Sequence, residues 1–338
     1  MPTIADTDVI RCTVAPRSPF RLLDLPLLSR LHLAGFRPRK RLSRRLVGKP
    51  ARRLFRWLLD LGITGHGHFS FSGAAGERRI RFNGRNTQFS ALYLPQNLPV
   101  YEAETSSLLD ALVPADGVFF DIGSNWGWFA LLIGGRAGFT GQVHAFEPFP
   151  ATFADLESVV MQAGLQPRIA CHGIALADRD GEATMGISDG MHSGLASLGA
   201  STGAKVKMAR LDSLGLPAPQ VMKIDVEDHE LEVLQGATAT IDAARPVIVF
   251  ESWLHPRDPQ ITLGPLHLLG QRDYRFFYPG WVQQDADCIR GGNDARTDRL
   301  ALVPLLPAQR FELPRQLNIV AVPAEKLDLL RQRLNAAA

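Results

Sequence analysis

The segment Val118–Phe129, which reads VFFDIGSNWGWF, constrains the fold of this chain more than any other. Its first three residues are apolar and predict a central buried strand that ends at Asp121. Gly123 and Gly127 frame the turn that follows, where glycine lets the backbone approach a ligand closely. Residues 128–136 then have the pattern of a helix. The segment therefore predicts a strand, turn and helix that hold a nucleotide-like ligand.

The glycine spacing distinguishes this turn from a dinucleotide-binding one. A dinucleotide fingerprint reads G-x-G-x-x-G and presents helix N-terminal amides to a pyrophosphate, whereas this turn reads D-x-G-x-x-x-G. An acid before the first glycine repels a pyrophosphate and suits a ligand with an ammonium group, such as S-adenosylmethionine. The alternative is a purely structural turn, because glycine-rich turns also occur in α/β proteins that bind no ligand.

A second acidic residue follows the next predicted strand. This strand covers Gln142–Phe146, and Glu147 stands at its end, 20 residues beyond Gly127. A carboxylate in this place can accept hydrogen bonds from both hydroxyls of a ribose. The feature serves NAD as well as S-adenosylmethionine, so that only the glycine spacing favours the latter.

Strand patterns alternate with helix patterns along the rest of the chain. Helices are predicted at 152–163 and 230–241, and strands at 168–174, 220–226 and 245–251, with two edge strands at 274–278 and 318–322. This alternation predicts an α/β fold with a doubly wound, mostly parallel sheet. In such sheets ligands bind at the carboxyl ends of the strands. Five acids fall at or just beyond these ends: Asp121, Glu147, Asp178, Asp225 and Glu251.

Several short segments resemble, in their order and spacing, those of the FkbM family of S-adenosylmethionine-dependent methyltransferases. The resemblance is strong over residues 101–251 and extends weakly to about residue 323. Family members usually carry glycine after the first glutamate of the K-x-D-x-E run, whereas here Asp228 and His229 follow Glu227. The most informative segments are FDIGSNWG from Phe120, AFEP from Ala145, KIDVEDHE from Lys223 and RPVIVFE from Arg245.

The resemblance implies a class I, Rossmann-like methyltransferase domain with a seven-stranded sheet over residues 101–325, followed by a helix or tail at 326–338. It also implies methyl transfer to oxygen, commonly a hydroxyl of a saccharide, glycolipid or secondary metabolite. On this basis the predicted cofactor-binding residues are Asp121, Gly123, Asn125, Gly127, Glu147, Asp178 and Asp225.

Methyl transfer to a hydroxyl needs an aligned acceptor and a means of removing its proton, either a general base or a divalent ion. Asp225, Glu227 and Lys223 are spaced two apart, so that an extended chain projects them to one face. We predict that they are catalytic. The alternative is a structural ion pair between Lys223 and Glu227. Asp225 and Glu251 are the candidate ligands of a metal, but two acids do not establish a site, and the metal stays unknown.

Two histidines and two tryptophans are further candidates. His192 lies in the segment 183–204, which is rich in Gly, Ser and Ala and is expected to be a flap over the acceptor or a surface loop. His192 and His229 are the less favoured candidates for the base. Trp253 and Trp281 follow predicted strand ends, where they are either acceptor walls or packing aromatics.

The first hundred residues differ from the rest in charge. Between residues 11 and 56 there are 14 Lys or Arg against the single acid Asp24, although the whole chain carries a net charge of only +3. Leu, Phe and Trp are interleaved with these cations, which is compatible with amphipathic helices. We predict a basic N-terminal arm, followed at 69–93 by a β-hairpin region, within a unit of residues 1–100. The arm suits peripheral contact with an anionic membrane. Nucleic acid and a helical lid on the catalytic domain are the alternatives.

Cysteine use and hydropathy limit the class of protein. The three cysteines are far apart, which argues against a disulfide framework or a zinc site. No apolar run of about 18 residues is present, and residues 1–9 do not have the pattern of a signal peptide. We therefore expect a cytoplasmic protein, with peripheral contact at the inner face of the membrane as an extension. The alternative functions are an NAD-linked oxidoreductase and a non-catalytic cofactor-binding protein that engages membrane or nucleic acid through the arm.

Overall fold

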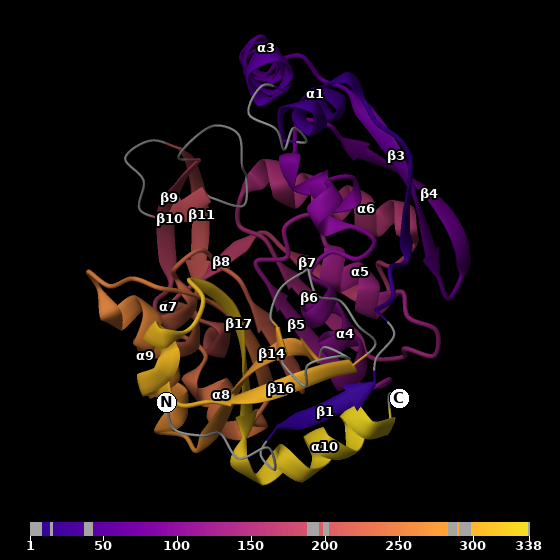
Figure 1. The fold of residues 1–338 in the computed structure, drawn as a ribbon. Helices are drawn as coiled ribbons and strands as arrows, with labels where there is room; N and C mark the ends of the chain where they lie inside the picture. Colours follow the sequence, from indigo (N-terminus) through magenta and orange to yellow (C-terminus); the bar gives the residue numbers. More distant parts are fainter. Residues whose placement is uncertain are drawn as a thin grey trace.

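The computed structural model describes residues 9–13, 16–36, 43–187, 196–198, 203–282, 289–290 and 299–336. These residues form a ten-stranded sheet, a four-stranded sheet and a three-stranded sheet, with helices on both faces of the largest one (Figure 1). Within these ranges no helix is both long and apolar enough to cross a membrane.

The ten-stranded sheet confirms the predicted doubly wound architecture. Five neighbouring strands, in the order β13-β12-β5-β6-β7, are parallel, and β17 and β14 follow at one edge, with β17 antiparallel to both of its neighbours. These seven strands are β5 (Val118–Ile122), β6 (Gln142–Phe146), β7 (Ile169–His172), β12 (Val221–Ile224), β13 (Val247–Trp253), β14 (Tyr274–Val282) and β17 (Gln316–Pro323).

Three strands that the sequence pattern did not predict extend this sheet. β16 (Arg299–Leu305) pairs with β14, and β1 (Ile10–Thr13) pairs with β16 at the edge. β15 (Ile289–Arg290) forms a short pair with β14. A strand from the basic N-terminal region is therefore part of the main sheet.

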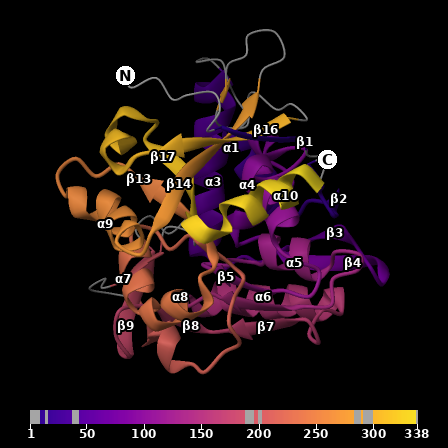
Figure 2. The ribbon, with the colours of Figure 1, turned by 90° about the horizontal axis from the view of Figure 1, so that it is seen from below.

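The helices bury one apolar core on each face of the sheet. The adjacent residues Phe119 and Phe120 of β5 belong to different core clusters, as the alternation of side chains along a strand requires. Figures 1 and 2 show the two helical layers on either side of the strands. One layer contains α4 (Ala103–Leu112), α5 (Trp128–Gly134), α6 (Pro150–Ala163) and α10 (Leu327–Ala336), and the other contains α7 (Glu230–Gln235), α8 (Thr238–Ala244) and α9 (Pro259–Gly270).

The prediction of a single helix over 230–241 was wrong, because the chain breaks it at Gly236. A Cβ atom on Gly236 would lie 1.9 Å from the carbonyl oxygen of Ala177, so that only glycine fits there. α8 then begins as a new helix, and the carboxylate of Asp212 accepts hydrogen bonds from its first turn, including the N–H groups of Ala239 and Thr240 at 2.8 Å.

Two smaller sheets flank the main one. The predicted hairpin is present as β3 (His66–Gly73) and β4 (Gly76–Asn83), and β2 (Phe20–Asp24) completes a three-stranded sheet. The described parts of the segment 183–204 are strands of the other sheet, and the intervening residues, with His192, lie outside the described ranges. Its strands are β8 (Ile174–Leu176), β9 (Gly181–Ile187), β10 (Ala196–Leu198) and β11 (Ala204–Ala209).

The N-terminal helices pack on the chain that leads into the main sheet. α1 (Leu27–Phe36) lies against α3 (Lys49–Asp60), which follows a π-helical turn at Arg44–Gly48. α1 also contacts a 3₁₀ helix, η3 (Thr87–Leu92). His32 of α1 and the hydroxyl of Tyr93, just after η3, form a buried hydrogen bond of 2.9 Å. Shorter 3₁₀ turns are η4 (Pro95–Asn97), η6 (Leu211–Ser213), η8 (Pro307–Glu312) and η9 (Ala324–Lys326).

The turn after β5 packs closely against another part of the backbone, a contact that the prediction of a ligand-binding turn did not include. Gly123 has a φ of +79°, and a Cβ atom there would lie 1.8 Å from the carbonyl oxygen of Asp225. Asn125 is also left-handed, with a φ of +52°, which asparagine tolerates better than most residues. Position 123 thus brings the turn after β5 directly against the end of β12.

We expect Gly123→Ala to lower the free energy of unfolding more than a glycine substitution that introduces backbone strain but no collision. Gly164 has a φ of +69°, and no atom lies within 4 Å of the place that a Cβ atom would take, so that Gly164→Ala should lose only about 1–2 kcal/mol. Gly123→Ala adds a collision with backbone and should lose a further amount of about 1–3 kcal/mol. Urea denaturation of both variants measures the difference, and equal losses would contradict the close approach.

Candidate functional site

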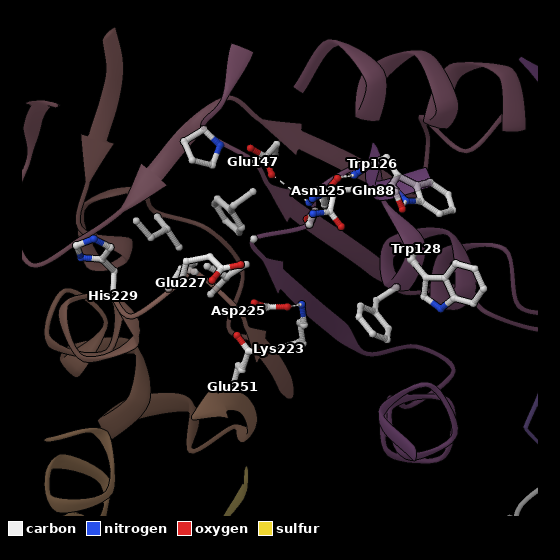
Figure 3. A pocket seen from close by; sticks show the side chains of 18 of the residues that line it. Gln88, Asn125, Trp126, Trp128, Glu147, Lys223, Asp225, Glu227, His229 and Glu251 are labelled. Atoms are coloured by element: carbon white, nitrogen blue, oxygen red, sulfur yellow. Dashed lines mark hydrogen bonds and ion pairs between the residues drawn. The ribbon is translucent and has the colours of Figure 1, made fainter. Parts of the chain in front are cut away.

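A cavity of about 240 Å³ opens at the carboxyl ends of the central parallel strands (Figure 3). Its walls come from β5, β6, β12 and β13, from η3 and from the segment before α4. The structure brings eight of the predicted site residues together here: Gly123, Asn125, Glu147, Lys223, Asp225, Glu227, His229 and Glu251.

Glu147 is held rigidly at the end of β6. Its Oε2 accepts a hydrogen bond from the backbone N–H of Asn125 at 3.1 Å, and its Oε1 accepts one from the N–H of Phe149 at 2.9 Å. Burial raises the pKa of Glu147 to about 7, although these two hydrogen bonds oppose the shift. Each carboxylate oxygen has a further lone pair, so that Glu147 can accept hydrogen bonds from a pair of ligand hydroxyls.

Lys223 and Asp225 form a buried ion pair at the end of β12. The Nζ atom of Lys223 lies 2.8 Å from Oδ2 of Asp225 and 4.9 Å from the ring centroid of Phe129. Burial by itself would favour the neutral amine, but the carboxylates of Asp225, Asp121 and Glu102 raise the pKa of Lys223 well above its usual value. The lysine thus pairs with Asp225, and not with Glu227 as the structural alternative supposed.

Glu227 lines the cavity, but it does not lie on the extended strand that was predicted to place it there. β12 ends at Ile224, and Glu227 and Asp228 have left-handed backbones with φ of +52° and +75°. The extended alternation over three residues therefore stops before Glu227. Its side chain nevertheless lines the cavity, where burial and the nearby charge of Asp225 raise its pKa to about 8.

Asp228 stands after Glu227, at the position where the resemblance to the FkbM family leads us to expect glycine. Its left-handed backbone is one that aspartate adopts more readily than most residues. Its Oδ1 also lies 2.8 Å from Nε2 of His255, which fixes the side chain outside the turn. Asp228 thus adopts a left-handed turn conformation without being glycine, and contacts the segment after β13.

Glu102 is a site residue that was not predicted from the sequence. Glu102 precedes α4 with a φ of +40°, is buried against the cavity, and accepts a hydrogen bond from Nδ2 of Asn318 at 3.3 Å. Burial raises the pKa of Glu102 to about 7, and burial together with the charge of Asp225 raises that of Glu251 to about 9. Gln316 donates a hydrogen bond to Glu251. The only sequence signal for Glu102 was its place in the segment YEAE from Tyr101, at the start of the residues that resemble the FkbM family, because Glu102 follows no strand.

Three predicted residues do not line the cavity. Asp121 is fully buried beneath it, where Oδ2 accepts a hydrogen bond from the N–H of Ala130 at 3.0 Å in the first turn of α5. Burial raises the pKa of Asp121 to about 6. Gly127 is the N-cap of α5 and approaches Leu156. Asp178 lines a separate depression and pairs with Arg179 at 3.1 Å. Among the predicted cofactor-binding residues, these three are therefore the ones outside the lining of the cavity.

Of the remaining candidate residues, two line the wall of the cavity and one is buried in the apolar core. Trp253 lines the cavity, in line with its interpretation as a wall residue, whereas Trp281 is fully buried in the core as a packing aromatic. His229 lines the cavity, and a hydrogen bond with Glu232 raises its pKa. In the described ranges no three His, Cys, Asp or Glu side chains are arranged as metal ligands, so that Asp225 and Glu251 remain a pair.

The comparisons with known proteins agree with this geometry. The family model described as the methyltransferase FkbM domain matches residues 118–276. After the model that they match, residues 118–276 are called the FkbM domain. This FkbM domain contains β5, β6, β12 and β13, whose ends form the cavity, while Glu102 and Gln316 come from chain outside it.

One relative and two solved structures show how far the likeness extends. The hexuronic acid methyltransferase AglP of Haloferax volcanii is 32% identical over 161 residues, which are 46% of this chain and 65% of the relative. The FkbM methyltransferase structure from Methylobacillus flagellatus aligns at 20% identity with a TM-score of 0.38, covering 63% of this chain and 47% of the other. An O-methyltransferase from Thermotoga maritima aligns at 14% identity with a TM-score of 0.35, covering 70% and 77%.

We predict that stability falls as the pH rises, because the FkbM domain holds carboxyl groups in their protonated form. The pKa of Glu227 is about 8 when folded and 4.5 in an unconstrained chain, so that the folded state binds more protons between these values. The free energy of unfolding then decreases as the pH rises through this window, by at most about 1.4 kcal/mol per pH unit for one group.

Glu227→Gln should remove part of this slope, and urea denaturation at several pH values from about 5 to 8 measures it. Glu182→Gln, at an exposed position on β9, is the matched control and should leave the slope unchanged. An unchanged slope in Glu227→Gln would show that Glu227 ionises as it does in the unfolded chain.

Proposed function

We propose that the protein transfers a methyl group from S-adenosylmethionine to a hydroxyl oxygen of a saccharide, with hydroxyls of glycolipids and secondary metabolites as related acceptors. The observation that carries this proposal is a cavity lined by five carboxyl groups and a single buried lysine. An excess of acids suits a ligand with sulfonium and ammonium groups and repels the pyrophosphate of NAD. The five acids are Glu102, Glu147, Asp225, Glu227 and Glu251.

Glu147 fits the nucleoside end of this cofactor. Its two oxygens are anchored by backbone N–H groups and can each accept one ribose hydroxyl. Gly123 and Asn125 have left-handed backbones and line the cavity in the turn after β5, where the N–H of Asn125 donates to Glu147. The residues present are therefore compatible with S-adenosylmethionine.

Asp225 is the residue that we assign as the general base. Bound S-adenosylmethionine supplies a methyl group that the sulfonium sulfur already activates. Oδ2 of Asp225 is paired with Lys223, which stabilises the carboxylate, and Oδ1 remains to take the proton of the acceptor hydroxyl. Lys223 is thus a positioning residue, enclosed so that it holds Asp225 in one orientation.

Glu227 has a different role in this proposal. With a pKa of about 8 it is mostly protonated at neutral pH, so that in the free protein it cannot act as the base. A protonated carboxyl group can instead donate a hydrogen bond to an acceptor oxygen. In this proposal Asp225, which is paired with Lys223, is the base, and the neighbouring Glu227 is a hydrogen-bond donor.

A saccharide acceptor is supported by the relative from Haloferax volcanii, whose name specifies a hexuronic acid. Trp253 lines the same cavity and is an aromatic side chain that a sugar can contact there, with the guanidinium of Arg315 over its ring at 5.7 Å from the centroid. A hexuronic acid saccharide and its neutral counterpart are therefore the first acceptors to compare.

We expect calorimetric titration to show binding of S-adenosylmethionine and S-adenosylhomocysteine, with Kd in about the micromolar range, and no binding of NAD. Glu147→Gln should weaken both interactions about tenfold, because it replaces a charged acceptor with a neutral amide. Titrations in chelator and with magnesium show whether an ion contributes. Binding of NAD alone would overturn the proposed cofactor.

We expect Asp225→Asn to keep cofactor affinity within a few-fold and to lower kcat by about 10²-fold or more, since it removes the base. The matched control is Asp178→Asn, which changes an acid after a neighbouring strand but outside the cavity. Transfer of a labelled methyl group to the acceptor measures both. A normal kcat in Asp225→Asn would remove Asp225 from the mechanism.

A further inference from the structure

Exposed apolar side chains are concentrated in the N-terminal helices. Among the described residues, 14 large hydrophobic side chains are exposed, and nine of them lie between Leu23 and Ile63. This segment lies at the end of the molecule opposite to α10 (Figure 1). Such a concentration in one part of the chain indicates an interaction surface, since single exposed apolar residues are otherwise scattered.

α3 presents two parallel stripes to solvent. Leu54 and Trp57 of α3 and Leu61, its C-cap residue, are spaced i, i+3 and i+7, and their exposed fractions are 44%, 57% and 56%. Their stripe lies beside the buried face, which contains Phe55 and Ala51. The helix therefore has a broader apolar surface than its contacts with α1 cover.

The second stripe is cationic. Lys49, Arg53 and Arg56 are spaced i, i+4 and i+7 and are all exposed. No ion pair joins them to a carboxylate in the part of the chain that the structure describes, and Asp60 is the only acid of α3. Unpaired cations thus run alongside exposed Leu and Trp side chains.

We propose that these two stripes of α3 form a docking surface for an anionic lipid bilayer. A helix that lies in a membrane interface places Trp and Leu side chains at the boundary with the acyl chains, while Lys and Arg contact anionic headgroups. Leu54, Trp57 and Leu61 supply the first contact, and Lys49, Arg53 and Arg56 the second.

The charge of the surface disfavours the other occupants. In a symmetric dimer the same patch faces itself, so that the cations of one copy would oppose those of the other. Nucleic acid would use the cations but gives no reason for three exposed apolar side chains in a row. A bilayer with anionic headgroups is complementary to both stripes at once.

The docking surface is connected to the wall of the cavity. α3 packs on α1, and α1 packs on η3, whose residues Gln88 and Ala91 line the cavity. The backbone oxygen of Gln88 also accepts a hydrogen bond from the indole N–H of Trp126 at 3.1 Å. Docking through α3 therefore holds the FkbM domain at the membrane through a continuous packed path.

Sedimentation of the full-length protein with vesicles tests the docking surface without cofactor or acceptor, so that its failure is separate from a failure of methyl transfer. Vesicles of phosphatidylcholine with phosphatidylglycerol should bind the protein, and vesicles of phosphatidylcholine alone should bind it at least about tenfold more weakly. The double variants Leu54→Ser/Trp57→Ser and Arg53→Glu/Arg56→Glu should each lower binding about tenfold or more.

The matched control is Leu329→Ser/Arg331→Glu on α10, at the opposite end of the molecule. Leu329 is 43% exposed, close to the value for Leu54, so that the control removes a similar apolar side chain together with a surface cation, Arg331, which pairs with Asp328 at 3.1 Å. Its binding should equal that of the unmodified protein. Circular dichroism of each variant confirms that the fold is retained.

Fluorescence quenching by brominated lipids reports insertion directly. The chain has five tryptophans, of which Trp57 is exposed, whereas Trp126, Trp128 and Trp281 are buried. Trp57→Phe should still sediment with anionic vesicles but should lose most of the quenching. A protein that stays in the supernatant, or self-associates or binds RNA through these same residues instead, would overturn the proposal.

Discussion

The cavity depends on the interaction between the buried, positively charged Lys223 and the carboxyl groups around it. Five carboxyl groups around one enclosed space would repel one another if all were ionised, and burial makes each charge more costly. Lys223 compensates part of this cost, because it pairs with Asp225 and lies close to Asp121 and Glu102. The remaining acids respond by binding protons, as the raised pKa values of Glu227 and Glu251 indicate.

This arrangement leaves the site poised for a cation. A positively charged ligand that enters the cavity would supply the charge that the protein lacks and would release protons from the raised acids. The cost of assembling the carboxyl groups is present in the free protein and is offset when such a ligand binds. A methyl group on a sulfonium ion is one chemistry that uses a site of this kind, and the proposed function follows from that electrostatic match.

The sequence predicted the parts of the site that local rules determine. The positions of β5 and β6 and the place of Glu147 follow from apolar runs, and the structure confirms them. The contact of Gly123 with the backbone of Asp225 was not predicted, although the glycine itself marks the turn. Strand alternation failed at Glu227 because the chain turns left-handed after β12, which periodicity cannot indicate. Glu102 was missed because tertiary packing, and not a strand end, brings it to the cavity.

The basic N-terminal region is not a detachable arm. β1 pairs with β16 in the main sheet, and β2 pairs with β3, so that two segments of this region are structural. Removing residues 1–56 would expose the edge of β16 and would remove β2 from its pairing with β3. A loss of membrane binding would then follow from misfolding alone. Substitutions confined to the exposed stripes of α3 leave these pairings intact, which is why the surface has to be tested residue by residue.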